Sequence, residues 1–344
     1  MKYLIILSFV LSIAGTATAA TYTCSNNPTG GAQYSTLNDA YNACALSGDT
    51  ILLQSSETDY TISPDWEKSI VVIGRGLTGT GSSTISSRID MRTLGSGSEF
   101  YGIDFSSYLN VQTTTDSVAV FNCRFNGSYG VFFQNSGTEW SFTNCIFSGS
   151  ATDKVYLPGG ANAVSAIFRS CLFVSNVFGA DSPNHSLLFD HCIFMKNTTG
   201  ANDGHFENVR NAVISNSIFM NASPIVDDQS IDNVFQNNLY PDTMTMPPAN
   251  NLGAGNIPGD PSFVSFTGPF YSESDEYELI GGSPGTGAAV DGSDVGLHGG
   301  NAGFNEELEP AIVPIITSVL IQNAVVGPGA TLNVDLEGRS PVND

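Results

Sequence analysis

The middle of the chain repeats one short phrase of apolar and polar residues. Each copy begins with an apolar residue, ends with an aromatic one and carries cysteine, serine or asparagine at its fourth position. A period of 21 to 26 residues, with one β-rich phrase per copy and turn formers between copies, is typical of a β-solenoid and excludes helical repeats. The six copies occupy residues 120–125, 142–147, 168–173, 189–194, 214–219 and 235–240.

The repeated phrase also predicts which side chains fill the solenoid. We expect the first, fourth and sixth residues to point inward, with the sixth forming a column of aromatic rings spaced like the strands of a sheet, about 4.8 Å apart. Alternation fails at the third residue, which indicates a sharp bend. Asparagine tolerates the left-handed conformation that such a bend needs, so Asn122, Asn144, Asn216 and Asn237 are expected to form a ladder of turns.

The fifth residue of the phrase is predicted to point outward, yet it is aliphatic in five successive copies. These residues, the apolar stripe, are Ile146, Leu172, Ile193, Ile218 and Leu239. Such a continuous patch is unusual on the surface of a monomer. Either the chain covers it, for which our hypothesis is the tail at 311–336, or a partner or second copy docks on it. Self-association through the stripe or through the C-terminal extension is thus one prediction.

A short helix is predicted in front of the repeat, at about 35–47. Ser35 is the expected N-cap, Leu37, Tyr41 and Cys44 share one apolar face, and Gly48 follows as the stop. The helix would cover the first coil of the solenoid.

With this helix, the repeated phrases and the closing segments at 260–264 and 277–300, the chain resembles the right-handed parallel β-helix proteins of the pectate-lyase-like superfamily. The resemblance implies an all-β fold in which the β-helix spans residues 20–300. Residues 301–314 are expected to form an acidic linker and residues 315–344 a short β-rich extension. These features specify an architecture and not an activity.

The composition and charge of the chain exclude some classes of protein. The 344 residues are 41% hydrophobic and 13% charged, which predicts a folded chain with a large core. A net charge of −22 argues against binding nucleic acid. Lys2, the apolar run after it and the small residues up to Ala19 predict a secretory signal peptide at 1–19. We therefore expect a secreted or extracellular protein, at the cell surface or in the periplasm, without a membrane span.

Export favours oxidised cysteines, but their positions matter. Four of the six cysteines hold the fourth position of the phrase, where parallel inward side chains do not readily adopt disulfide geometry. These four are predicted to be buried free thiols. Cys24 and Cys44 lie outside the repeat and are predicted to form one disulfide that pins the helix over the first coil.

Candidate catalytic residues are few. The resemblance implies that a lyase of this fold would need a lysine or arginine base and a Ca²⁺ ion or arginine beside a uronic carboxylate. Lys196, Arg210, His205 and Asp203 fall in one region between two phrases and form the best such set, although loop charges of this kind are more often only solvated.

Calcium is the one cofactor that the sequence brings into consideration. Asp227, Asp228 and Asp232 offer hard oxygen ligands, without a recognised motif. No histidine has a second ligand at the spacing of a transition-metal site.

Two function classes remain. The lack of a recognisable catalytic set favours a non-catalytic protein with a glycan-binding, adhesin-like or assembly role, whose partner is a polysaccharide or cell-surface glycan. The alternative is a divergent polysaccharide lyase or glycoside hydrolase that acts on an acidic polysaccharide.

Overall fold

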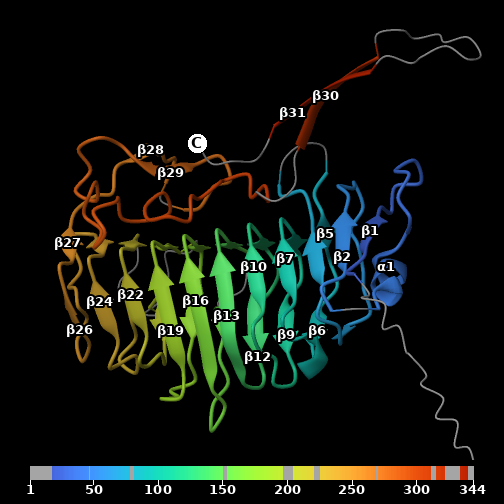
Figure 1. The fold of residues 1–344 in the computed structure, drawn as a ribbon. Coiled ribbons are helices and arrows are strands. Elements are labelled where there is room, and N and C mark those ends of the chain that lie inside the picture. The colour runs from blue at the N-terminus through green and yellow to red at the C-terminus, as the bar shows by residue number, and fades with distance from the viewer. Residues whose placement is uncertain are drawn as a thin grey trace, which may run out of the picture.

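Three long parallel sheets, wound from successive coils of the chain, make up the body of the molecule (Figure 1). Strands pair in parallel with their equivalents in neighbouring coils, as β13 (Gly137–Thr143) does with β10 (Ala119–Phe121) and β16 (Val164–Arg169). The β-solenoid that the repeat predicts, and the right-handed parallel β-helix that the resemblance implies, are thus confirmed. The computed structural model describes residues 18–45, 47–77, 81–149, 153–196, 204–220, 225–268, 270–310, 315–321 and 334–339.

The first sheet has eleven strands, the second nine and the third seven. The other strands of the first sheet are β1 (Thr21–Cys24), β2 (Thr50–Leu53), β4 (Val71–Ile73), β7 (Glu99–Tyr101), β19 (Ser186–Asp190), β22 (Val213–Ser215), β24 (Val234–Gln236) and β26 (Leu252–Ala254). The second sheet comprises β5 (Thr84–Ile85), β8 (Asp104–Phe105), β11 (Arg124–Phe125), β14 (Ile146–Phe147), β17 (Leu172–Phe173), β20 (Ile193–Phe194), β23 (Ile218–Phe219), β25 (Leu239–Tyr240) and β27 (Ile257–Pro258). The third comprises β3 (Asp65–Trp66), β6 (Ile89–Met91), β9 (Leu109–Val111), β12 (Val131–Phe133), β15 (Asp153–Tyr156), β18 (Asn176–Phe178) and β21 (Phe206–Glu207).

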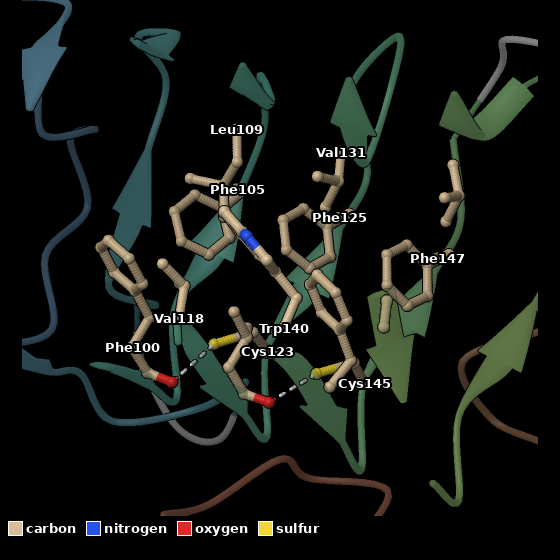
Figure 2. Close-up of a cluster of buried hydrophobic side chains, with 14 of the residues drawn as sticks. Phe100, Phe105, Leu109, Val118, Cys123, Phe125, Val131, Trp140, Cys145 and Phe147 are labelled. Carbon is tan, nitrogen blue, oxygen red and sulfur yellow. Dashed lines mark hydrogen bonds between the residues drawn. The ribbon is translucent and has the colours of Figure 1, made fainter. Parts of the chain in front are cut away.

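Columns of similar side chains fill the solenoid, as the phrase predicts (Figure 2). Phe125, Phe147, Phe173 and Phe194 occupy matching positions in the second sheet, with consecutive ring centroids 4.9, 4.8 and 5.1 Å apart. These rings are almost parallel because the register of the strands places them directly above one another. The core is therefore continuous from coil to coil.

From β7 onward, a residue in the left-handed conformation joins the first sheet to the second in each coil. Its φ lies between 46° and 72° at Gly102, Asn122, Asn144, Ser170, His191, Asn216, Asn237 and Gly255. The predicted ladder of turns is confirmed, with serine, histidine and glycine at the positions that lack asparagine. This corner turns the chain between two strands while the first and fourth residues of the phrase, such as Val120 and Cys123, both point inward.

The four cysteines of the repeat are buried free thiols, as predicted: Cys123, Cys145, Cys171 and Cys192. Each thiol donates toward a backbone carbonyl of the preceding coil, as Cys145 Sγ does toward the oxygen of Val120 at 3.5 Å. Figure 2 shows this contact and the equivalent one of Cys123. Burial raises the pKa of the Cys123 and Cys171 thiols, which keeps the column uncharged.

The predicted disulfide between Cys24 and Cys44 is wrong, because both are free and buried. Cys44 turns its thiol back onto the preceding helix, where Sγ donates to the carbonyl oxygen of Ala40 at 3.4 Å. Cys24 ends β1 beside Leu53 of β2. Burial raises the pKa of both thiols to about 11, so neither is a reactive thiolate at neutral pH.

Helix α1 (Leu37–Ala43) packs at the N-terminal end of the solenoid, as predicted, with a different cap. Thr36 is the N-cap instead of Ser35, and its Oγ1 accepts a hydrogen bond from the backbone of Asp39 at 3.1 Å. At the other end, Lys68 Nζ donates to the carbonyl oxygen of Tyr41 at 2.6 Å. Capping and apolar packing therefore hold the helix where a disulfide was expected.

The apolar stripe is buried beneath a later part of the same chain. Ile146 is 4% exposed, and the other four stripe residues are fully buried. They form one cluster with residues of the closing segment, which we define as residues 263–308. The segment contributes Phe263, Tyr277, Leu279, Ala289, Val295, Leu297, Phe304 and Leu308. The expectation that the chain itself covers the stripe is confirmed, and the alternative, that the stripe is an interaction surface for a partner or second copy, is wrong.

The cover precedes the tail at 311–336 that was expected to supply it. β28 (Phe263–Ser265) and β29 (Glu276–Leu279) begin the closing segment as an antiparallel pair. Residues 301–308, expected to be linker, belong to it too, because Phe304 and Leu308 are apolar anchors within an acidic stretch.

Beyond the closing segment, β30 (Ile315–Ile321) and β31 (Val334–Arg339) form an antiparallel hairpin that projects from the body (Figure 1). The remaining short element is the 3₁₀ turn η1 (Thr93–Gly95). Residues 1–17 of the predicted signal peptide and 311–314 of the predicted linker lie outside the described residues.

The left-handed corner generates a stability prediction. Asn122 has φ 51°, so Asn122→Val should lower the free energy of unfolding by about 1–2 kcal/mol, because a β-branched side chain is poorly tolerated there. Asn122→Gly should cost clearly less, since glycine has no Cβ. Urea unfolding compares the two variants. Equal losses would contradict a conformational role for this position.

The free thiols generate a chemical prediction. In protein that has never been reduced, all six cysteines should react with a thiol reagent after unfolding in guanidinium and resist it in the folded state, because all six are buried. Peptide mapping by mass spectrometry reads out each site. Recovery of a disulfide-linked peptide pair containing Cys24 and Cys44 would contradict the structure.

Candidate functional site

Aromatic residues point outward from neighbouring strands of the third sheet. In β12, Val131 and Phe133 are buried, and Phe132 between them faces the outside. The strand register pairs Phe132 with Tyr156 of β15, and Tyr156 with Phe178 of β18. Three successive coils therefore place an aromatic ring at the same outer position.

These rings form one partly exposed surface. The Phe132 and Tyr156 centroids are 4.4 Å apart with planes 10° from parallel, and Tyr156 and Phe178 are 5.0 Å apart at 14°. Tyr129 lies edge-on to Phe132 at 5.1 Å, and Tyr108 lies edge-on to Tyr129 at 5.4 Å. We call these five residues the ring ladder. Each is only partly buried, so ring faces and edges are open to solvent.

Polar groups flank the ladder in the same outer row. At one end, Phe132 pairs with Asn110, which in turn pairs with Asp90. Asn110 Nδ2 donates to Asp90 Oδ1 at 2.7 Å. At the other end, Phe178 pairs with Glu207 of β21. A carboxylate therefore lies at each end of the aromatic row, with Asp90 and its partner Asn110 buried and Glu207 partly exposed.

An arginine connects the ladder to its polar end. Arg88 forms an ion pair with Asp90 at 2.7 Å. The pKa of Arg88 is raised, chiefly by this hydrogen bond to Asp90 and next by one with Tyr108, a ladder residue. The Tyr108 ring is thereby tied to the carboxylate at this end of the row.

This arrangement can bind a flat ligand and offers little for catalysis. The ring faces provide apolar contact, and the tyrosine hydroxyls and flanking carboxylates provide hydrogen-bond donors and acceptors. The first sheet has a smaller outward pair, Tyr101 and Phe121, stacked at 4.7 Å. Burial, and then a hydrogen bond to Glu99, raise the pKa of Tyr101, whose hydroxyl donates to Glu99 Oε2 at 2.6 Å.

The predicted lyase-like residues have separate surroundings. His205 is fully buried near Phe194 and Phe219, with Nε2 3.3 Å from the carbonyl oxygen of Met220. Burial, and then the nearby charge of Lys196, lower the pKa of His205 to about 3. A buried histidine that stays neutral through the physiological range is a poor general acid or base. Lys196 is itself 9% exposed.

Arg210 has different neighbours from Lys196 and His205. Its Nε lies in an ion pair with Asp181, and Nη1 is 3.9 Å from Asp232 Oδ2. Asp203 lies outside the described residues. The structure therefore brings Lys196 near His205 and engages Arg210 with other carboxylates.

Two of the three aspartates proposed as calcium ligands instead contact protein groups. Asp227 accepts hydrogen bonds from the backbone of Asn208 at 3.1 Å and from the hydroxyl of Ser230 at 2.6 Å. Asp232 faces Arg210, and Asp228 is exposed. Within the described ranges, no three His, Cys, Asp or Glu side chains are placed to hold a metal ion.

Sequence reasoning missed the ring ladder. Its rings lie outside the repeated phrase, in segments separated from the corners by loops of different length, so their common register is not visible in the sequence. The usable signal is that Phe132, Tyr156 and Phe178 each follow a β-branched residue and recur at about the period of the repeat.

Among protein-family models, curated proteins and solved structures, similarity to this chain is found among the solved structures. No protein-family model matches the chain, and no curated protein matches it. Similar solved structures include the crystal structure of pectate lyase Pel9A, with 14% identity over 82% of this chain and 97% of that one, at a TM-score of 0.49. Pectin methylesterase from Aspergillus niger in its deglycosylated form has 16% identity, 81% and 98% coverage and a TM-score of 0.40.

A further similar structure is DFA-IIIase from Arthrobacter chlorophenolicus A6 in complex with GF2, with 11% identity, 69% and 90% coverage and a TM-score of 0.28. Identities and TM-scores at these levels assign neither a substrate nor an activity to this chain. The topology and the surface define the class: a parallel β-helix protein with an outward row of aromatic rings. No helix among the described residues is long and apolar enough to cross a membrane.

Buried His205 generates a pH prediction. Its native pKa is about 3, whereas an unfolded histidine titrates near 6.5, so the unfolded state takes up the proton first. The stability of the native state should therefore fall as the pH drops below about 6.5. His205→Gln removes this titrating group. Between pH 7 and pH 5, the variant should therefore lose about 2 kcal/mol less unfolding free energy than the wild type. Parallel pH profiles in urea unfolding would contradict the assignment.

Proposed function

We propose that this chain is a non-catalytic glycan-binding β-helix protein that holds a neutral polysaccharide on the ring ladder. The observation that carries the proposal is the row of stacked outer rings at Phe132, Tyr156 and Phe178, extended by Tyr129 and Tyr108. The core does not account for these rings, because separate inward columns fill it. Partly exposed aromatic surfaces of this extent are typical of interaction sites.

Sugars match the chemistry of the ladder. A pyranose ring has an apolar face of C–H groups, which packs on an aromatic face, and a rim of hydroxyls, which need hydrogen-bond partners. The row extends across several coils, which suits an extended polymer chain better than a single sugar. A secreted location, as predicted from residues 1–19, would bring the protein into contact with such polymers.

The charge around the ladder favours a neutral glycan. The chain carries a net charge of −22, and Glu207 ends the row of rings. An acidic polysaccharide would bring like charges together, whereas the hydroxyls of a neutral one can donate to carboxylate oxygens.

The alternative, a polysaccharide lyase, has weaker support. Its candidate base Lys196 is almost buried, His205 stays neutral, and Arg210 is engaged by Asp181 and Asp232. An adhesin-like or assembly role is compatible with glycan binding and rests on the same surface. Self-association through the C-terminal extension stays a prediction.

Loss of the central ring tests the proposed function. Tyr156→Ala should weaken retention on a soluble neutral polysaccharide in affinity electrophoresis by about tenfold, because the ring contacts both neighbours in the row. Tyr156→Phe should retain affinity within about twofold, since it keeps the ring. The gels would contain hydroxyethylcellulose, galactomannan, xylan or polygalacturonate.

The matched control is Phe121→Ala, which removes an outward ring of the first sheet and should leave retention unchanged. Absence of retention on every neutral polysaccharide would overturn the proposal. Release of unsaturated products from polygalacturonate, abolished by Lys196→Ala, would replace it with the lyase alternative.

A further inference from the structure

The ring ladder is nearly straight, and its shape restricts which glycans can follow it. The ring planes of Phe132 and Tyr156 differ by 10°, and those of Tyr156 and Phe178 by 14°. Inside the solenoid, the planes of Phe147 and Phe173 differ by 1°. These angles are smaller than the roughly 20–25° by which neighbouring strands usually twist. Successive coils are therefore stacked with little rotation, and the outer row runs along the solenoid without bending (Figure 1).

The sheet also sets the spacing of the row. Neighbouring strands lie about 4.8 Å apart in any sheet, and the ring centroids here are 4.4 and 5.0 Å apart. Successive sugars of an extended 1,4-linked pyranose chain advance by a similar length, because each sugar spans the ring from C1 to C4. A glycan that lies along the solenoid can therefore place one sugar at each coil.

Polar groups accompany the row of rings on two sides. Gln134 follows Phe132 by two residues, is exposed, and shares its outer face because side chains alternate along a strand. The strand pairing extends this far, since the Gln134 amide donates to the carbonyl oxygen of Val111 at 3.0 Å. Tyr129 precedes the strand and lies edge-on to Phe132. An apolar row with polar groups beside it matches a flat glycan with C–H groups on its faces and hydroxyls along its edges.

The linkage between sugars decides whether a glycan stays flat and straight. Equatorial bonds at C1 and C4, as in β-1,4-linked glucose, mannose or xylose, keep successive sugars in line. An axial bond at C1, as in α-1,4-linked glucose, turns each sugar relative to the last and coils the chain, and a β-1,3 linkage also bends it. A coiled chain would contact fewer rings before it leaves the surface.

We propose that the ring ladder selects extended β-1,4-linked glycans, which lie along the solenoid axis with one sugar to a coil. This inference rests on the proposed function and extends it, because it specifies the linkage and the direction of the bound chain. The contacts are distributed over the rings at Phe132, Tyr156 and Phe178, so affinity depends on the length of the glycan.

Isothermal titration calorimetry of the full chain with matched tetrasaccharides tests the linkage. Cellotetraose, maltotetraose and laminaritetraose contain the same four glucose units in β-1,4, α-1,4 and β-1,3 linkage, so they differ in chain shape alone. Mannotetraose and xylotetraose supply the β-1,4 linkage with other hydroxyl patterns. At least one β-1,4-linked tetraose should bind at least about tenfold more tightly than maltotetraose and laminaritetraose. Its disaccharide should bind about tenfold more weakly, because it reaches fewer rings.

A variant at one end of the row tests the direction of the chain. Phe178→Ala should weaken binding of the preferred tetraose by about fivefold or more. It should change binding of the matching disaccharide by less than about twofold, since Phe132 and Tyr156 remain for two sugars. A general loss of structure would weaken both ligands alike. Phe121→Ala, on the first sheet, should leave both affinities unchanged.

The results that would overturn this inference are distinguishable from failure of the proposed function. Equal or tighter binding of maltotetraose or laminaritetraose would refute selection by linkage and leave glycan binding intact. A tetraose that binds no better than its disaccharide would refute the placement along the solenoid. Absence of binding by every β-1,4-linked tetraose would also overturn the inference, and the proposed function would then stand only if the affinity gels still retain the protein. If Phe178→Ala fails to fold, the wild-type comparisons still decide.

Discussion

The left-handed corner between the first and second sheets is the constraint on which the rest of the structure depends. Because one residue bends the chain at the same point in each coil, as at Asn122 and Asn144, the strands on either side stay in register over the whole solenoid. The corner also determines side-chain direction. It turns the fourth residue of the phrase and the aromatic sixth residue inward, and it turns the fifth residue between them outward.

The outward faces of the second and third sheets differ in what covers them. On the second sheet, the outward residues are aliphatic and accept the closing segment, which buries them. On the third sheet, the outward residues include Phe132, Tyr156 and Phe178, which remain partly exposed. One apolar row is thus used for packing in cis, and the other stays partly exposed.

The fold was predictable because the corner and its flanking residues are contiguous in the sequence. The ring column, the thiol column and the corner ladder all follow from one six-residue phrase. That some segment covers Ile146 and its equivalents was predictable, but which segment does so was not. Pattern alone shows that an apolar stripe needs a cover, but which segment reaches it depends on contacts of Phe263 to Leu308.

The candidate site was less accessible to sequence reasoning. The ring ladder depends on the register of strands joined by loops of unequal length. The expected disulfide failed for a related reason: Cys24 and Cys44 are close along the chain, but the cap helix directs the Cys44 thiol to its own backbone. Residue types alone do not determine these directions.

The most direct test of the central claim is a crystal structure of the protein with a neutral oligosaccharide that it retains. The account predicts sugar rings stacked over Phe132, Tyr156 and Phe178, with hydroxyls reaching the polar ends of the row. An oligosaccharide bound on another face, with the ring ladder unoccupied, would contradict it.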